Sequence, residues 1–234
     1  MASEIALITG ASKGVGRSIA KKLAKTGLTV FATARNVDQL ESLKKEIEGN
    51  SGSCICYATE LADESQIAEM VNEILKERLE IKVLVQNAGV ALVGPVKDMP
   101  LSAWQQSLDV NLTAPFLLTQ KSIPILSKNA HIFFINSVAG IQAFPEWSAY
   151  CASKYGLKAL ADSLRQELAP DGIKVTTIYP ASINTKLQDK LPYDWDRDKM
   201  LNPNDVAEAL VNCYKQPAHV QIKDIHLENL AGTF

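Results

Sequence analysis

Short apolar runs alternate with stretches of helical periodicity along the whole chain. Most of these runs are nearly continuous in Val, Ile, Leu and Phe, which is typical of parallel strands covered on both faces. They predict strands at 5–9, 29–34, 53–58, 82–86, 131–136, 174–179 and 222–227. Between the runs, apolar residues recur at three- and four-residue spacing, as at Ile19, Leu23 and Ala24, and predict amphipathic helices.

This alternation predicts an α/β fold in which one sheet of seven parallel strands is covered by helices on both faces. Crossovers between parallel strands are right-handed, so the arrangement is the doubly wound, Rossmann-type sheet. No repeat, linker or low-complexity stretch interrupts the pattern, and we therefore predict a single domain over residues 1–234. Because the segment 188–202 lacks clear periodicity, we expect a lid or binding loop at about 186–202.

The composition narrows the class of protein and its partners. The 234 residues are 47% hydrophobic and 21% charged, and the formal net charge of -2 favours neither nucleic acid nor an anionic membrane as a partner. No apolar run approaches the roughly 20 residues that span a bilayer. The first predicted strand begins too early to leave room for a signal peptide, so we expect a cytoplasmic protein.

Neither the cysteines nor the histidines indicate a metal site. Cys54 and Cys56 would share one face of a strand, but no Cys/His group has the spacing of zinc ligands. His131, His219 and His226 are isolated from one another in the sequence. We expect buried, reduced thiols and no bound metal.

The stretch "TGASKGVG" at residues 9–16 follows the first predicted strand and opens the first predicted helix. Its glycines, Gly10, Gly14 and Gly16, are spaced four and then two apart, unlike the G-x-G-x-x-G fingerprint. Three glycines after a strand also suit a simple tight turn. Their place between strand and helix favours a second interpretation, because the N-terminus of the helix offers free N–H groups to a pyrophosphate.

Five further stretches follow in order: "QNAG" at 86–89, "LDVNLTAPF" around Asn111, "INSVAG" around Ser137, "YCASK" at 150–154 and "YPASINT" at 179–185. With the glycine loop, they resemble the motifs of the short-chain dehydrogenase/reductase family over nearly the whole chain. The resemblance implies a nicotinamide-dependent oxidoreductase with a Ser–Tyr–Lys–Asn catalytic set. It also implies cofactor contacts from Gly10, Ser12, Lys13, Gly14, Val15, Gly16, Arg35, Glu60, Leu61, Asn87, Ala88, Gly89, Tyr150, Lys154, Pro180, Ile183 and Thr185.

Two positions depart from the family pattern. Glu60 and Leu61 stand where the family usually has Asp–Val, and Ala181 replaces the usual glycine after Pro180. Glu60 still offers a carboxylate to the adenine amino group, on a side chain that is one methylene longer. Neither change removes a catalytic group.

The residues around the second strand favour NADP(H) over NAD(H). NAD enzymes of this fold carry an acid at the end of this strand, but here Ala34 is followed by Arg35. An arginine suits the 2′-phosphate of NADP, and Lys13 in the glycine loop supplies a second cation. Asp38 is the competing acid, but it falls in the first turn of the next helix, where the helix dipole favours an acid anyway. The alternative is that both cations are solvated surface charges.

Tyr150 and Lys154 lie four residues apart in a helical stretch and therefore share one face. Such a pair is usually a surface pair, and what singles this one out is Ser137 at the end of the fifth strand. We expect Lys154 to lower the pKa of the Tyr150 phenol, so that the phenol exchanges a proton with a carbonyl oxygen that Ser137 also binds. By resemblance, Lys154 binds the nicotinamide ribose and Asn111 holds a water that relays protons, whereas Tyr155 points elsewhere.

The residues that follow the motifs are mainly apolar and predict a pocket for an uncharged ketone or aldehyde of modest size. They are Ala91, Leu92, Val93, Ile141, Phe144, Trp147, Leu187, Leu191, Tyr193 and Trp195. Several of them equally suit the core or a subunit interface. The acidic lid residues Asp189, Asp194, Asp196 and Asp198 argue against a highly anionic substrate, which makes a 3-oxoacyl substrate a less favoured alternative.

Two other functions stay open. One is an NAD(P)-linked alcohol dehydrogenase that works in the oxidative direction. The other is a catalytically silent NADP-binding sensor or scaffold, although such a protein would be expected to lose the serine, tyrosine or lysine that this chain contains. The resemblance also implies a homodimer or homotetramer that pairs through the helix with the Tyr–Lys motif and through the last helix and strand.

Overall fold

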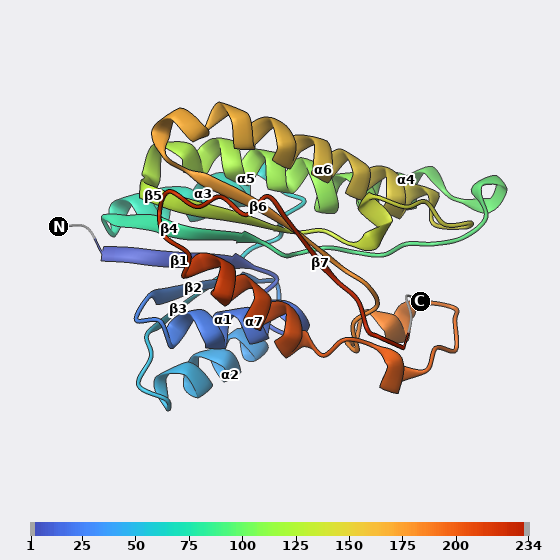
Figure 1. Ribbon diagram of the computed structural model, residues 1–234, viewed down its shortest axis with the longest axis horizontal. Helices are drawn as coiled ribbons and strands as arrows, with labels where there is room; N and C mark the ends of the chain where they lie inside the picture. The colour runs from blue at the N-terminus through green and yellow to red at the C-terminus, as the bar shows by residue number, and fades with distance from the viewer. Residues whose placement is uncertain (1–2, 232–234) are drawn as a thin grey trace.

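Seven parallel strands form one sheet in the computed structural model, which describes residues 3–231 (Figure 1). Their spatial order is β3-β2-β1-β4-β5-β6-β7. The strands are β1 (Ser3–Thr9), β2 (Thr29–Ala34), β3 (Cys54–Ala58), β4 (Leu79–Gln86), β5 (Leu126–Ile135), β6 (Lys174–Pro180) and β7 (Asp224–Leu227). The predicted fold class, a doubly wound parallel α/β sheet, is confirmed.

Helices cover both faces of the sheet (Figure 1). On one face lie α1 (Gly14–Ala24), α2 (Val37–Glu48) and α7 (Pro203–Tyr214), and on the other lie α3 (Glu64–Lys76), α4 (Leu101–Leu108), α5 (Ala114–Ser122) and α6 (Ser148–Glu167). Within β1, Ala6 and Ile8 pack in the core on the α1 side, whereas Ile5 and Leu7 pack in the core on the α6 side. Successive side chains of a strand point to opposite faces, so two buried faces require the continuous apolar runs seen in the sequence.

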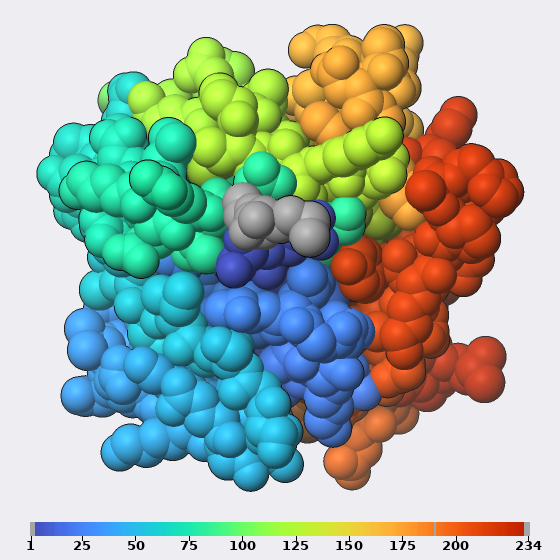
Figure 2. Space-filling model, turned by 90° about the vertical axis from the view of Figure 1, so that its left-hand side faces the viewer, coloured from blue at the N-terminus to red at the C-terminus, as the bar shows by residue number. Residues whose placement is uncertain are grey.

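The direction of chain progression reverses between β1 and β4. From β1 the chain moves outward through β2 to β3, and it then returns to pair β4 on the other side of β1. The chain therefore turns to opposite faces of the sheet after β1 and after β4, to α1 and α4, and this divergence leaves a crevice at the carboxyl edge. Figure 2 shows the opposite edge, where β1 begins between the segment that joins α1 to β2 (blue) and the C-terminal part of the chain (red).

Several predicted segments differ in detail from the structure. β4 begins at Leu79 rather than at residue 82, and β7 begins at Asp224 rather than at residue 222. β5 begins at Leu126 rather than at His131, because its first residues include Lys128 and Asn129, which break the apolar run, and Asn129 takes a φ of +58°. The predicted lid is a packed cover with two short 3₁₀ helices, Gln188–Lys190 and Arg197–Lys199, rather than a loop without regular structure. Among residues 3–231, none of the helices has both the length and the apolar character needed to cross a membrane.

Candidate active site

The glycine loop turns sharply after β1 and leaves the start of α1 open. Gly10 and Gly14 have φ angles of +64° and +55°, which residues with a Cβ rarely adopt. A Cβ on Gly16 would lie 2.4 Å from the carbonyl oxygen of Gly10. Side chains cap α2, α3 and α7, whereas no side chain caps α1 and its first turn holds no acid. The free N–H groups and partial positive charge at this helix start suit an anion.

Hydrogen bonds to Thr9 hold the loop after β4 beside the glycine loop. Its Oγ1 accepts from the backbone N–H groups of Asn87 at 2.9 Å and Ala88 at 3.0 Å, and it donates to the carbonyl oxygen of Val85. The Asn87 amide donates to the carbonyl oxygen of Thr9 at 2.8 Å. The sequence places Thr9 at the end of a strand and at the start of the glycine motif, but it does not predict this role, because the partners of Thr9 lie far along the chain.

Arg17 ties the glycine loop to the start of α2. Its Nη1 donates to the carbonyl oxygens of Ser12 and Gln39, each at 3.1 Å. Ser12 precedes Lys13 in the glycine loop. Gln39 lies in the first turn of α2, four residues after Arg35. Arg17 therefore fixes the spacing of the two segments that carry the predicted 2′-phosphate cations. The motifs do not single out this arginine.

Arg35 and Glu60 meet at the rim of the crevice, after β2 and β3. Their side chains are 67% and 41% exposed, and Arg35 Nη1 donates to Glu60 Oε2 at 3.2 Å. Gln66 Oε1 accepts from the backbone N–H of Glu60 at 2.9 Å and fixes the position of this residue. An exposed ion pair is weak, so the guanidinium stays available to an incoming anion. Asp38, the competing acid, is exposed in the first turn of α2 and does not line the cavity.

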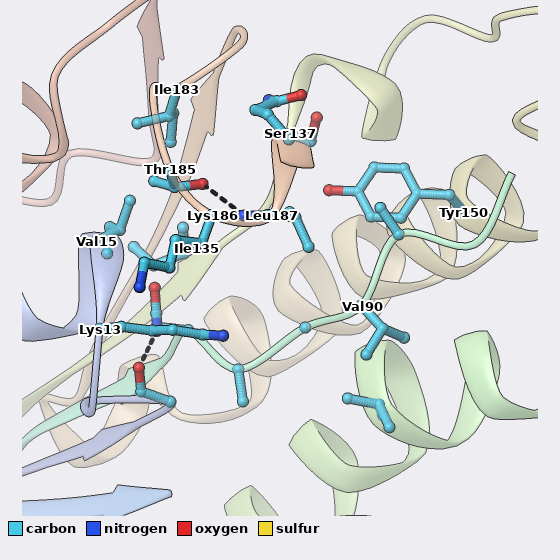
Figure 3. A pocket seen from close by; sticks show the side chains of 18 of the residues that line it. Lys13, Val15, Val90, Ile135, Ser137, Tyr150, Ile183, Thr185, Lys186 and Leu187 are labelled. Carbon is cyan, nitrogen blue, oxygen red and sulfur yellow. Dashed lines mark hydrogen bonds between the residues drawn. The ribbon is translucent and has the colours of Figure 1, made fainter. Parts of the chain in front are cut away.

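Tyr150 and Lys154 lie one turn apart on α6, and both are buried. The Tyr150 hydroxyl reaches into the cavity toward the side on which Ser137 lies (Figure 3). Lys154 Nζ lies 5.7 Å from the centre of the Tyr150 ring and donates to the carbonyl oxygen of Ile135 at 3.0 Å. The end of β5 thus positions both Ser137 and the lysine ammonium.

Burial governs the titration of both groups on α6. It raises the pKa of the Tyr150 phenol to about 12, although hydrogen bonding to Ser137 acts in the opposite direction. Burial also lowers the pKa of the Lys154 ammonium to about 8. The expectation of a lowered phenol pKa is therefore wrong for the protein chain alone, because burial disfavours the phenolate more than hydrogen bonding to Ser137 favours it. The phenol keeps its proton at neutral pH.

The Asn136 side chain hydrogen-bonds the backbone of both Ser137 and Lys154. Its Oδ1 accepts from the backbone N–H of Ser137 at 2.9 Å, and its Nδ2 donates to the carbonyl oxygen of Lys154 at 3.1 Å. A Cβ on Gly140 would lie 2.5 Å from Asn136 Oδ1, so the small residue makes room for this amide. One buried side chain therefore joins the end of β5 to α6.

Asn111 occupies a π-helical turn, Asp109–Thr113, between α4 and α5. Its Oδ1 accepts from the backbone N–H of Val90 at 2.8 Å, and its Nδ2 donates to the carbonyl oxygen of Val90 at 2.9 Å and to Ser153 Oγ at 3.0 Å. The Asn111 side chain thus anchors the loop after β4 and does not line the cavity. Its predicted role in holding a water stays a prediction.

A cavity of about 1210 Å³ runs along the carboxyl edge of the sheet and brings these groups together. Of the residues predicted to contact the cofactor, Gly16 does not line it, because this glycine lies beneath the loop against Gly10. The others line the cavity: Gly10, Ser12, Lys13, Gly14, Val15, Arg35, Glu60, Leu61, Asn87, Ala88, Gly89, Tyr150, Lys154, Pro180, Ile183 and Thr185.

The predicted substrate pocket is only partly correct. Ala91, Leu92, Phe144, Trp147, Leu187, Leu191 and Trp195 line the cavity. Val93 instead borders a neighbouring hollow of about 220 Å³. Ile141 is 39% exposed, and Tyr193 packs on Trp147 without lining the cavity. These three misplacements reflect loop conformations that periodicity does not predict.

The sequence model of the short chain dehydrogenase family matches residues 4–195. Human dehydrogenase/reductase SDR family member 11 is 34% identical over 241 residues, which cover 95% of this chain and 93% of that protein. A metagenomic short-chain oxidoreductase solved in complex with NADP is 31% identical, with a TM-score of 0.85 over 97% of this chain and 96% of the other. Actinorhodin polyketide ketoreductase, solved as a variant with NADPH, is 26% identical, with a TM-score of 0.88 over the full length of both chains.

The family match spans most of the chain, and the relatives match it over nearly their whole length, in sequence for the human protein and in fold for the solved structures. The glycine loop, the serine after β5 and the Tyr–Lys pair on α6 lie around one cavity, as the resemblance implied. The chain therefore belongs to the short-chain dehydrogenase/reductase family of oxidoreductases.

Proposed function

We propose that the protein is an NADP(H)-dependent oxidoreductase that reduces a ketone or aldehyde to an alcohol. The observation that carries this proposal is one continuous cavity with Ser137, Tyr150 and Lys154 in its interior and the glycine loop and Arg35 at its rim. Relatives solved with NADP or NADPH at 31% and 26% identity add support.

The residues present fit a dinucleotide with a 2′-phosphate. The uncapped start of α1 suits the pyrophosphate, and the glycine loop has no space for a Cβ at Gly10 or Gly16. Arg35 and Lys13 supply positive charge for the 2′-phosphate, and Glu60 supplies an acceptor for the adenine amino group. Lys154 Nζ supplies donors for the nicotinamide ribose.

The hydroxyl groups of Ser137 and Tyr150, which line the cavity, carry out the proton transfer and bind the carbonyl oxygen. NADPH, when bound, supplies the hydride that a carbonyl carbon accepts. Ser137 Oγ donates a hydrogen bond to the carbonyl oxygen, and Tyr150 transfers its phenolic proton to that oxygen as negative charge develops there. The raised pKa of Tyr150 keeps this proton in place until it is needed. The Lys154 ammonium then stabilises the phenolate by its positive charge.

An activity assay tests this function. It measures the consumption of NADPH and, in parallel, of NADH in the presence of a panel of ketones, aldehydes and diketones. We expect turnover with at least one carbonyl and a preference for NADPH. Binding of NADPH without turnover of any compound would instead indicate the sensor or scaffold. Faster oxidation of alcohols with NAD⁺ than reduction of carbonyls with NADPH would indicate the alcohol dehydrogenase.

The predicted homodimer or homotetramer is part of the proposal. Phe116 on α5 and Tyr155 on α6 are 45% and 43% exposed, as expected for residues that a partner subunit covers. Size-exclusion chromatography with light scattering measures the mass in solution. A monomer at micromolar concentration would contradict the prediction.

A further inference from the structure

Aromatic side chains form one wall of the inner cavity. Trp147 at the start of α6 and Trp195 in the lid are nearly parallel, with ring centroids 6.0 Å apart and planes 7° apart. Phe144 meets Trp147 edge to face at 6.3 Å. All three line the cavity, and each is only partly buried, so ring surface remains open to a ligand. We call Phe144, Trp147 and Trp195 the aromatic wall.

Tyr193 holds this wall in place from outside the cavity. Its ring is nearly parallel to both tryptophans, at 6.0 Å from Trp147 and 5.2 Å from Trp195. The indole Nε1 of Trp147 donates to the Tyr193 hydroxyl at 3.2 Å, and that hydroxyl donates to Glu146 Oε2 at 3.1 Å. Because hydrogen bonds and ring contacts both fix the lid to the start of α6, the wall exists before a ligand arrives.

The aromatic wall begins beside the proposed proton donor. The centroids of the Trp147 and Tyr150 rings are 5.5 Å apart, at an angle of 72°. If the oxygen of a carbonyl compound accepts from Tyr150 and Ser137, one substituent on the carbonyl carbon therefore lies next to Trp147. Ala91 and Leu92 after β4 line the same cavity with small or aliphatic side chains.

Charged groups occur elsewhere along the cavity. Arg35, Lys13 and Glu60 are at the adenosine end, Lys154 donates to β5, and Lys186 lines the cavity in the segment after β6. The lid pair Arg197 and Asp189 neutralise each other at 2.7 Å. The wall itself carries no charge, so it offers no counter-ion to a charged substituent next to the carbonyl.

We propose that the substrate is an uncharged carbonyl compound with an aromatic ring, and that Trp147 and Trp195 select this ring. The inference deepens the proposed function and rests on it. Contacts between aromatic rings add to the burial of apolar area, by an amount equivalent to about 2- to 12-fold in affinity for each pair. A saturated ring of the same size lacks this contribution.

Two ketones isolate the ring from the carbonyl chemistry: 4-phenylbutan-2-one and 4-cyclohexylbutan-2-one. Two methylenes separate ring and carbonyl in both, so the intrinsic reactivity of the carbonyl is matched. With NADPH, we expect kcat/KM for the phenyl ketone to exceed that for the cyclohexyl ketone by about 10-fold. A phenyl ketone with a carboxylate on the ring should lose most of this activity.

Substitutions in the aromatic wall test whether it causes the preference for the phenyl ketone. Trp147→Leu and Trp195→Leu should each bring the phenyl-to-cyclohexyl ratio toward one, and the second variant serves if the first does not fold. Trp104→Leu is the matched control, because Trp104 lies on α4 and does not line the cavity. A phenyl-to-cyclohexyl ratio near one in the unmodified protein, or an unchanged ratio in both wall variants, overturns the inference.

A binding measurement separates this inference from the proposed function. Isothermal titration calorimetry with each ketone reports binding without turnover, and it does not depend on the tryptophans that the variants remove. Tighter binding of the phenyl ketone, lost in the wall variants, with no NADPH consumption would contradict the proposed reaction but support the aromatic site. Turnover of both ketones with equal affinity would support the reaction and refute the aromatic site.

Discussion

Acid should destabilise this fold through His131, which is buried within the sheet on β5. Its Nε2 lies 2.8 Å from Thr176 Oγ1, and that hydroxyl already donates to the carbonyl oxygen of Ile222 at 2.6 Å. The ring nitrogen must therefore be the donor, which fixes the neutral tautomer with its proton on Nε2. Nδ1 has no hydrogen-bond partner among the residues that the structure describes. Protonation would place a charge there without an acceptor.

The size of the effect follows from the pKa. Burial, with a smaller contribution from the charge of Lys174, lowers the pKa of His131 from 6.5 to about 3. Between these values the unfolded chain binds a proton that the folded chain does not, so stability falls as the pH falls below 6.5. Each pH unit costs about 1.4 kcal/mol, so the loss between pH 7 and pH 5 is about 2 kcal/mol. Well above pH 6.5, this histidine contributes no pH dependence to the stability.

Urea unfolding followed by circular dichroism at pH 7, 6 and 5 measures the effect. His131→Gln cannot titrate, and it should lose about 2 kcal/mol less between pH 7 and pH 5 than the unmodified protein. His219→Gln is the control, because His219 is exposed, and it should keep the full pH dependence. Carboxylates titrate equally in all three proteins and cancel in the comparison. An unchanged pH dependence in His131→Gln would refute the reasoning.

Three substitutions test the cofactor half of the cavity. Arg35→Asp should lower the NADPH-to-NADH ratio of kcat/KM by at least about 10-fold, because repulsion replaces a charge-assisted hydrogen bond to the 2′-phosphate. An unchanged ratio would show that Arg35 does not bind the 2′-phosphate. Arg17→Met should raise KM for NADPH several-fold while kcat changes little, and equal effects on KM for NADPH and NADH would indicate a purely structural role. Gly16→Ala should abolish NADPH binding measured by calorimetry, because the added Cβ would lie 2.4 Å from the Gly10 carbonyl oxygen. Normal affinity for NADPH would show that the glycine loop tolerates a Cβ at this position.

Local patterns were sufficient to predict much of this molecule. The continuous apolar runs predicted the strands because both faces of the sheet are buried, and the four-residue spacing of Tyr150 and Lys154 predicted their shared helix face. The unusual glycine spacing corresponds to two positive φ angles and one close backbone approach at Gly16. Each of these features depends on residues that are neighbours in the sequence.

Features that depend on distant contacts were not predicted. Arg17 bonds Gln39 on another helix, and Tyr193 lies behind Trp147 rather than in the cavity. The direction of the Tyr150 pKa shift depends on how deeply α6 is buried, and spacing along a helix does not contain that information. In each case the deciding quantity is a tertiary distance or the exclusion of water.

The most direct test of the proposed reaction is the NADPH-dependent reduction of an active carbonyl compound by Tyr150→Phe, measured together with its affinity for NADPH. Tyr155→Phe is the matched control, because this second tyrosine of α6 does not line the cavity. We predict that Tyr150→Phe binds NADPH normally and loses at least about 100-fold in kcat, while the control keeps its activity. Turnover by Tyr150→Phe close to that of the unmodified protein would contradict the assignment of Tyr150 as the proton donor.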